Sequence, residues 1–332
     1  MTDIEARAAR LVEEVGLAQA ADVAAVRPLA GGVSSDIAAV TLGDGRTVCV
    51  KFALPRLRVA ADWRAPVRRN AAEYAWLRAA GAIVPGCAPA LLGVSPELHG
   101  FAMEFVAGEG VGLWKAALLA GAPERGEAAA VGDALGRIHA GSTRSGFGRA
   151  PFANRDDFRA LRIEPYLLFT ATRHPGVAPR LLALADALHA SEAALVHGDV
   201  SPKNILFRDG SPVLLDAECA TMGDPCFDVA FCLNHLLLKA VHRPEAAPER
   251  LRGAAELWAA YAARVDWEAP DGIEARVAAL LPALLLARVD GKSPVEYLSE
   301  AGRTAVRARA LGLLRRGPET LGEIFRSMAG DP

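Results

Sequence analysis

Hydrophobic residues near the N-terminus follow two different periods. Apolar positions at helical spacing predict a helix over residues 4–15, and alternation predicts strands over residues 37–42 and 47–54. An Asp-Gly pair between these strands favours a tight hairpin. In the second strand three alternating apolar side chains share one face, and Lys51 lies on the opposite face. We therefore expect Lys51 to project into a cleft.

The hairpin is followed by a second helical pattern. Apolar spacing predicts a helix over residues 68–80 that contains Glu73 and ends with a C-cap at Gly81. Two further strands are predicted over residues 90–94 and 101–106. The N-terminal part of the chain is therefore expected to be rich in β-structure.

The remainder of the chain is dominated by Ala- and Leu-rich helical segments. A short β-like stretch over residues 195–218 interrupts them, and the apolar run of residues 277–287 predicts a buried helix too short to cross a bilayer. The pattern predicts an α+β fold with two lobes. We expect a small β-rich lobe over residues 1–106 and a larger, mainly helical lobe over residues 107–332.

Composition and charge exclude several classes of protein. With 52% hydrophobic residues in 332, the chain is not intrinsically disordered. The 37 basic and 39 acidic residues leave a net charge of −2, so we expect no nucleic-acid partner. The N-terminus lacks a basic region followed by an apolar one, from which we expect no secretory signal, no membrane partner and a cytoplasmic location. The five cysteines form no C-x-x-C pair and are expected to be buried thiols.

Lysine is scarce in a chain that otherwise uses arginine. Each lysine is therefore a candidate for a specific role. The five lysines are Lys51, Lys115, Lys203, Lys239 and Lys292.

Polar residues gather in the β-like stretch. Asp199 and Asn204 lie five residues apart on a predicted tight loop, and Asp216 ends the following hairpin. These three side chains can converge on one point. Phosphoryl transfer uses a carboxylate that orients a hydroxyl and accepts its proton, together with a carboxylate and an amide oxygen as hard ligands for Mg²⁺. The spacing therefore indicates phosphoryl-transfer chemistry.

The motifs around these residues resemble those of the aminoglycoside phosphotransferase and choline kinase-like family of small-molecule kinases. The resemblance rests on H-G-D-x-x-x-x-N at residues 197–204, D-x-E at 216–218 and G-D-P-x-x-D at 223–228, and it covers roughly residues 29–234. It implies a bilobal protein-kinase-like fold. It also implies ATP and Mg²⁺ as cofactors, and transfer of the γ-phosphate of ATP to a hydroxyl of a small metabolite.

The resemblance also implies a role for individual residues. Asp199 corresponds to the catalytic base, and Asn204 and Asp216 to the ligands of Mg²⁺. Lys51 corresponds to the lysine that contacts the nucleotide phosphates, and Glu73 to its ion-pair partner. The other nucleotide-binding residues implied are Gly31, Gly32, Ser34 and Ser35 in the loop over the phosphates, and Glu104 and Val106 in the hinge that holds adenine.

Neighbouring polar residues are expected to support the site. His197 is expected to brace the loop of residues 197–204. Asp224 and Asp228 are interpreted as scaffolding, and Asp228 is expected to cap a helix that begins near Val229 and to anchor this loop. Protein-serine kinases carry a lysine where this chain has Ser201, so neutralisation of the γ-phosphate would fall to Mg²⁺ and to Lys203, whose orientation toward phosphate or solvent stays open.

Three alternatives differ in class. A protein Ser/Thr kinase is disfavoured because only six residues separate Asp216 from Gly223 and no D-F-G or A-P-E motif occurs. A nucleotide-binding regulator without transferase activity is disfavoured because the polar groups are intact. A P-loop kinase is excluded by the missing G-x-x-x-x-G-K-[ST] motif.

The acceptor is the least defined part of the prediction. Residues 241–332 contain 13 acidic and 13 basic side chains, so this region offers little attraction to a polycationic aminoglycoside. Arg288, Asp290 and Lys292 surround a glycine directly after the apolar run. We expect Arg288 or Lys292 to bind an anionic or polar group of a hydroxylated substrate, and Asp290 to fix a hydroxyl or one of these two basic side chains. A charged loop in solvent is the alternative.

Overall fold

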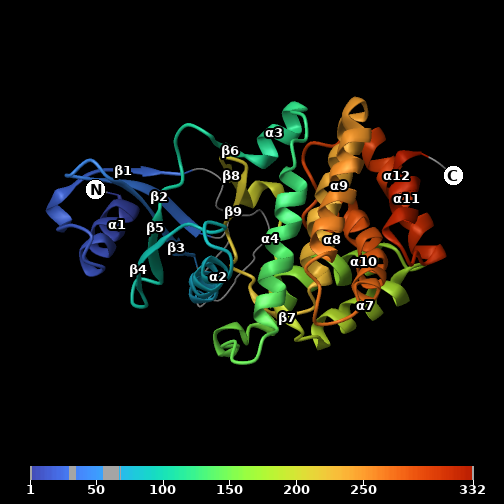
Figure 1. Ribbon diagram of the computed structural model, residues 1–332, viewed down its shortest axis with the longest axis horizontal. Coiled ribbons are helices and arrows are strands. Elements are labelled where there is room, and N and C mark those ends of the chain that lie inside the picture. The colour runs from blue at the N-terminus through green and yellow to red at the C-terminus, as the bar shows by residue number, and fades with distance from the viewer. Residues whose placement is uncertain (1, 30–34, 55–66, 68, 331–332) are drawn as a thin grey trace.

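The structure is a computed structural model, and it describes residues 2–29, 35–54, 67 and 69–330. A β-sheet with two helices forms the N-terminal part, and a larger group of helices forms the C-terminal part (Figure 1). This is the two-lobed α+β arrangement that the sequence predicts. The sheet ends at Glu104. The lobe boundary expected at residue 106 stays a prediction.

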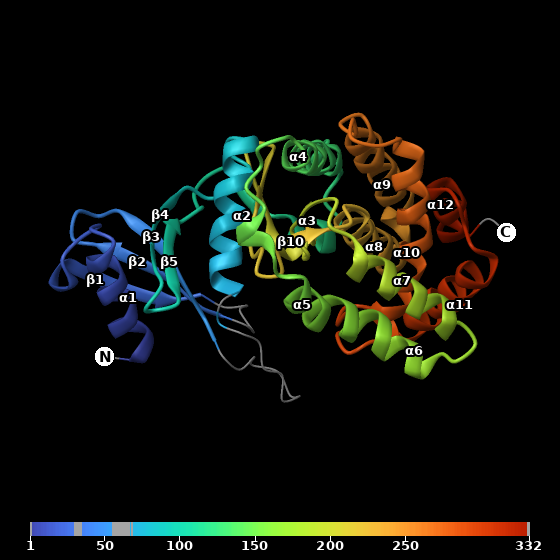
Figure 2. The ribbon, with the colours of Figure 1, turned by 90° about the horizontal axis from the view of Figure 1, so that it is seen from below.

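The N-terminal sheet has five antiparallel strands in the order β1-β2-β3-β5-β4. Helix α1 (Asp3–Glu14) packs on one face, and α2 (Arg69–Ile83) lies between the sheet and the helical lobe (Figure 2). The predicted hairpin is present as β2 and β3, with Ile37 opposite Lys51. The strands are β1 (Val23–Pro28), β2 (Ser35–Leu42), β3 (Thr47–Ala53), β4 (Leu91–Ser95) and β5 (Gly100–Glu104).

The pleat of β3 sets the direction of Lys51. Val48, Val50 and Phe52 pack with α1 in one apolar core. Cys49 belongs to the other core, which contains the buried residues of α2. Because side chains alternate along a strand, Lys51 lies on the same face as Cys49. Lys51 is therefore directed toward α2 and the helical lobe.

Helix α2 is longer than the sequence predicts. It continues through Gly81 to Ile83, so the predicted C-cap at Gly81 is wrong. Gly86, just past the end of the helix, has a φ of 86°. Glycine adopts this left-handed conformation without strain, so the chain turns at Gly86 rather than at Gly81.

Helices α8 and α10 form the centre of the larger lobe, where α8 packs against α9 and α10. The apolar run of residues 277–287 is buried within α10, as predicted, and all five cysteines are buried free thiols.

Within the ranges that the structure describes, no helix is long and apolar enough to span a membrane. The main helices are α3 (Trp114–Ala120), α4 (Glu127–Ser142), α5 (Arg155–Phe158), α6 (Phe169–Arg173), α7 (Ala178–Ala190), α8 (Cys226–His242), α9 (Ala247–Ala262), α10 (Pro270–Asp290), α11 (Glu300–Arg316) and α12 (Leu321–Ala329), with the π-helical segment η3 (Arg159–Leu168) between α5 and α6.

Two small sheets frame the loop of residues 197–204, which ends in the short helix η4 (Pro202–Asn204). Within the loop Gly198 has a φ of 81°, and a Cβ atom there would lie 2.8 Å from the Cβ atom of Cys219. Glycine is therefore required at this turn. The strands are β7 (Ala194–Val196) with β10 (Thr221–Gly223), and β8 (Ile205–Arg208) with β6 (Val111–Leu113) and β9 (Ser211–Leu214).

Candidate active site

Lys51 joins the two lobes. Its Nζ atom lies 2.8 Å from Oε1 of Glu73 on α2 and also contacts Oδ1 of Asp216, which is 165 positions away in the sequence. Burial disfavours the lysine cation, but Asp216 and Glu73 outweigh this effect and raise the pKa of Lys51. Burial raises the pKa of Glu73 to about 7, against the attraction of Lys51. The sheet, α2 and the helical lobe thus meet at one lysine.

Asp216 follows β9 in a left-handed backbone conformation, with a φ of 67°. This conformation is uncommon for a residue with a side chain and is found at functional turns. Burial opposes the charge of its carboxylate, but Lys51 and Lys203 lower the pKa of Asp216. The side chain of Asp216 is 26% exposed. An ionised and accessible carboxylate therefore faces the space between the lobes.

Asp199 is buried beside two cations. Its Oδ2 atom lies 3.1 Å from Nη2 of Arg162 and 3.1 Å from Nζ of Lys203. Burial alone would raise the pKa of Asp199, but Lys203 and Arg162 lower it. The Oγ atom of Ser201 lies 3.5 Å from Oδ1. The carboxylate is therefore ionised at neutral pH.

Arg162 is a site residue that the sequence analysis missed. It lies on η3, is buried, and donates from Nε to the carbonyl of Gly198 and from Nη1 to the carbonyl of Leu161 at 2.8 Å. One guanidinium thus contacts both the backbone and the carboxylate of the 197–204 loop. In the sequence Arg162 stands out only as a charged residue between two apolar ones, Leu161 and Ile163. Because arginine is common in this chain, that pattern did not identify it as a site residue.

Asn204 and Asp216 offer hard oxygen atoms to a cation. Nδ2 of Asn204 donates to the carbonyl of Asp199 at 3.1 Å, which assigns the other amide atom, Oδ1, as oxygen. Neither this oxygen nor Oδ2 of Asp216 has a partner among the described residues. In the same part of the chain no group of three or more His, Cys, Asp or Glu side chains could hold a metal. These two donors suit Mg²⁺, which binds through few protein ligands together with phosphate oxygens and water.

The 197–204 loop is anchored from below by α8. The buried carboxylate of Asp228 accepts hydrogen bonds from the backbone N–H groups of His197 at 2.7 Å and Gly198 at 2.8 Å. It also lies 3.3 Å from Nε2 of His139. Asp228 therefore anchors the loop as expected. The expectation that it caps the helix is wrong, because α8 begins at Cys226 and has no side-chain cap.

His197 braces the same loop through its ring. Its Nδ1 atom accepts from the N–H of Asp199 at 3.1 Å, so Nε2 is the donor to the carbonyl of Leu215 at 3.1 Å. Its ring lies edge-on to Trp76 of α2. Burial lowers the pKa of His197, which keeps the ring neutral. The ring therefore links the loop to the segment that carries Asp216.

The expected nucleotide-binding residues are only partly described. Ser35 is buried at the start of β2, whereas Gly31, Gly32 and Ser34 lie outside the described residues. The carboxylate of Glu104 accepts from Nη2 of Arg208 at 2.6 Å and from the N–H of Ala90 at 3.2 Å. The N–H of Glu104 also donates to the carbonyl of Ala90 at 2.8 Å, and a role of Glu104 in binding adenine stays a prediction. Val106 follows two residues after the end of β5.

The three charges expected to contact the acceptor lie in different settings. Both carboxylate oxygens of Asp290 lie 2.7 Å from Arg307, and Oδ2 also lies 2.8 Å from Nε2 of His174. Lys292 is exposed, with Nζ 5.6 Å from the ring centre of Phe169. Asp290 therefore fixes a basic side chain outside its own turn.

Arg288 contacts η3, the segment that also carries Arg162. It donates from Nη1 to the hydroxyl of Tyr166 at 3.3 Å and to Oγ of Ser293 at 3.0 Å. Tyr166 and Arg162 are one turn apart on η3. Arg288 is thus connected through η3 to the arginine that contacts Asp199.

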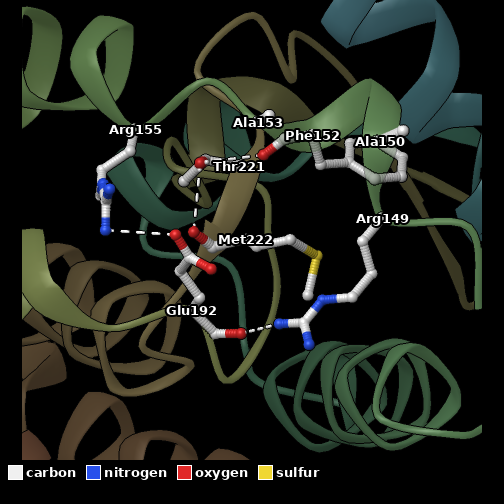
Figure 3. A pocket seen from close by; sticks show the side chains of 8 residues that line it. All are labelled: Arg149, Ala150, Phe152, Ala153, Arg155, Glu192, Thr221 and Met222. Carbon is white, nitrogen blue, oxygen red and sulfur yellow. Dashed lines mark hydrogen bonds and ion pairs between the residues drawn. The ribbon is translucent and has the colours of Figure 1, made fainter.

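A separate hollow of about 320 Å³ lies beside β10 (Figure 3). Arg149 and Arg155 both reach Glu192 across it, and the hydroxyl of Thr221 donates to the carbonyl of Phe152 at 3.2 Å (Figure 3). None of the expected site residues lines this hollow.

Comparisons with known proteins identify the fold and the family of this chain. Solved structures with a similar fold include a choline/ethanolamine kinase family protein from Mesorhizobium loti (19% identity, TM-score 0.57, covering 99% of this chain and 100% of that chain) and a choline kinase from Streptococcus pneumoniae (14%, 0.53, 95% and 100%). A third is an amicoumacin kinase in complex with AMP-PNP, Ca²⁺ and Ami (15%, 0.58, 96% and 98%). No curated protein matches the sequence. The model of the phosphotransferase enzyme family matches residues 25–269, so the chain belongs to this family and is a phosphotransferase with the protein-kinase-like fold.

Proposed function

We propose that this phosphotransferase moves the γ-phosphate of ATP to a hydroxyl of a small metabolite in the presence of Mg²⁺. The observation that carries the proposal is the contact of Lys51 with Asp216 across the lobes, beside the loop that bears Asp199. A base for the acceptor, a cation for the phosphates and oxygen ligands for a metal are thereby brought together. The fold neighbour that binds AMP-PNP and Ca²⁺ supports the use of a nucleotide and a divalent metal.

Asn204 and Asp216 are the residues that would hold Mg²⁺. When bound, Mg²⁺ would neutralise charge on the nucleotide phosphates. In the structure Lys51 and Asp216 are occupied by each other. We expect Mg·ATP to separate them, because phosphate would take the lysine while Glu73 keeps its contact with Nζ. Glu73 is therefore proposed to keep Lys51 in position during this exchange.

Asp199 is proposed to orient the acceptor hydroxyl and to receive its proton. Two cations keep the carboxylate ionised, which makes it a weak base. A weak base is adequate, because phosphoryl transfer depends chiefly on positioning and on neutralising phosphate charge. Lys203, whose side chain is half exposed, lies on the same carboxylate and is proposed to neutralise the transferred phosphate.

The two remaining alternatives receive less support. Thr221 of β10 comes five residues after Asp216, and α8 begins at Cys226, so the segment that docks peptides in protein kinases has no counterpart here. A regulator without transferase activity would not require an ionised Asp199 held between two cations, because it transfers no phosphate to an acceptor. A small-molecule acceptor, other than an aminoglycoside because residues 241–332 carry no net charge, fits better.

A library experiment tests the proposal. The protein is incubated with Mg·ATP and hydroxylated metabolites, and products are detected by the mass of an added phosphoryl group. Asp199→Asn serves as the matched control, because it keeps the size of the side chain and the proposed nucleotide site. Transfer by the wild type and not by this variant is expected. Nucleotide binding without transfer to any acceptor would instead favour a regulatory protein.

A further inference from the structure

One face of α8 carries an unusual set of buried side chains. Phe227, Phe231, His235 and Lys239 follow one another at four-residue spacing, so they lie on the same face of the helix. Each step advances by about 6 Å along the helix axis. The set begins next to Asp228, which anchors the 197–204 loop, and it ends about 18 Å farther along α8.

His235 and Lys239 are buried without adequate partners. His235 is 6% exposed, and its ring nitrogens form no hydrogen bond with any described residue. Lys239 is 2% exposed, and its only hydrogen bond in the described ranges goes to the carbonyl of His235 at 3.5 Å. Its Nζ atom lies 5.0 Å from the ring centre of Tyr297, a partial compensation for the lost hydration. Burying an amine without a carboxylate costs stability, so an anionic ligand that pairs with Lys239 would stabilise the arrangement.

Further donors without partners surround these two residues. The Nε atom of Arg288 and the hydroxyl of Tyr297 are buried, and neither has a hydrogen-bond partner in the described part of the chain. Lys115 on α3 lies near enough to act on both His235 and Lys239, and its own partner is Glu296 at 2.5 Å. Three cations therefore meet one carboxylate around this face of α8.

The surrounding elements connect this face to Asp199. The ring of Tyr166 packs on Phe231, and its hydroxyl accepts from Arg288 at 3.3 Å. Tyr166 shares η3 with Arg162, which contacts Asp199. On the other side α3 packs against η4, which carries Lys203. The unpaired donors and the proposed base thus border the same part of the helical lobe.

We infer that this face of α8 is the acceptor subsite, and that the acceptor is a small hydroxylated carboxylate whose anionic group binds Lys239 and Arg288. The inference rests on the proposed function. Lysine and arginine are the usual partners of carboxylates, and Phe231 offers an apolar wall between the anion and the reacting end. The acceptor hydroxyl lies toward Asp199. Its oxygen bonds to the γ-phosphorus as the bond to the β-phosphate oxygen breaks, ADP leaves, and the hydroxyl proton passes to Asp199.

Matched acceptors test the charge of the ligand. Polyhydroxylated carboxylates of graded length, from six-carbon aldonic acids to chains that can span the roughly 18 Å of this face, are compared with their amides and with the corresponding aminoalditols, all with Mg·ATP, and phosphorylated products are measured by mass. The carboxylates are expected to have a kcat/KM at least tenfold above those of the amides, and the aminoalditols are expected to be the poorest. Equal or better transfer to the amides or aminoalditols would overturn the subsite while leaving the kinase in place.

Matched lysine variants test the location. Lys239→Met should raise the KM of the carboxylate at least tenfold and leave the KM of ATP unchanged. Lys292 is exposed and was expected from the sequence as an alternative contact for the acceptor. Lys292→Met should change the KM of the carboxylate and the KM of ATP less than twofold. An unchanged acceptor KM in Lys239→Met overturns the subsite, as does an effect confined to Lys292→Met. If no compound in the three sets accepts phosphate, the subsite is rejected, and retention or loss of Mg·ATP binding then decides whether nucleotide use is also rejected.

Discussion

Two lysines of this chain are equally buried but differ in their charged partners and in their pKa values. Lys51 and Lys239 are each 2% exposed. Lys51 lies against two carboxylates, which raise its pKa in spite of burial. Lys239 has no carboxylate partner among the described residues, and burial lowers its pKa to about 7. The first charge is neutralised within the protein, and the second is not.

The difference separates a site that is already assembled from one that awaits a ligand. Lys51 and Glu73 sit on elements that the sheet and α2 fix rigidly, and Asp216 completes the set without help from outside. Around Lys239, by contrast, the described residues leave an imidazole and a phenol without hydrogen-bond partners, and the amine has only a 3.5 Å bond to the carbonyl of His235. Buried polar groups of this kind are costly, and their retention is expected where a ligand pairs with them. The proposed nucleotide and acceptor sites differ in this respect.

The largest expected effect concerns Asp199, the proposed base. Asp199→Asn should lower kcat by about 10² to 10⁴ and leave nucleotide affinity nearly unchanged, because it removes a positioned base and keeps the side-chain volume. Steady-state kinetics and calorimetric titration with Mg·ATP measure the two quantities. Wild-type turnover in this variant would show that Asp199 is not the base of the transfer reaction.

Substitutions of Lys51 and Glu73 test whether their ion pair contributes to catalysis. Lys51→Ala should lower kcat/KM for ATP at least tenfold, equivalent to about 1.4 kcal/mol, and Glu73→Ala should have a smaller effect in the same direction. The double variant should lose less than the sum of the two, because Glu73 is proposed to act through Lys51. Strictly additive losses in this cycle would show that the 2.8 Å contact does not position Lys51.

Local patterns predicted the strands and the direction of Lys51, whereas the pairing of Lys51 with Glu73 came from the family resemblance. Alternation in β3 gives the direction of Lys51, and an Asp-Gly turn gives the hairpin, because both are properties of a few neighbouring residues. The spacing of Asp199, Asn204 and Asp216 indicates their convergence for the same reason. The end of α2 was misjudged because tertiary packing carries the helix past Gly81.

Long-range partners were not predictable in the same way. Arg162 reaches Asp199 from η3, and nothing in its neighbourhood distinguishes it from other arginines. Asp290 was expected near the acceptor, but Arg307 on α11 takes both of its oxygens. Lys239 was singled out by the scarcity of lysine alone. Its burial depends on how α3, α8 and α10 pack, which periodicity does not reveal.

An effect of intermediate size is expected at Arg162, whose charge is predicted to lower the pKa of Asp199 near the proposed subsite. Arg162→Met removes one of two cations from Asp199, so the pKa of that carboxyl should rise. Activity requires the ionised form and is lost as pH falls, so the acid limb of the kcat/KM profile should move upward by about one pH unit. Arg162→Lys should restore part of the shift. Reduced activity with an unmoved acid limb in both variants would leave Arg162 a purely structural role.

The smallest expected effect concerns stability and sharpens the comparison of the two lysines. The pKa of Lys239 is about 7 in the folded chain, against the ordinary lysine value of 10.5. Between these pH values the unfolded chain binds the extra proton, so stability rises with pH. The groups that act on Lys239 are Lys115, Arg288, Cys232 and Glu296, none of which is altered in Lys239→Met. This variant should therefore melt higher than the wild type by about 2 °C near pH 6.5, since removing a buried amine with one long hydrogen bond recovers about 1 kcal/mol. The difference should shrink as pH approaches 9, and a carboxylate acceptor that binds the charged amine should stabilise the wild type and not the variant. A variant that melts lower than the wild type at every pH would show that Lys239 is satisfied in the free protein, and the contrast with Lys51 would then be lost.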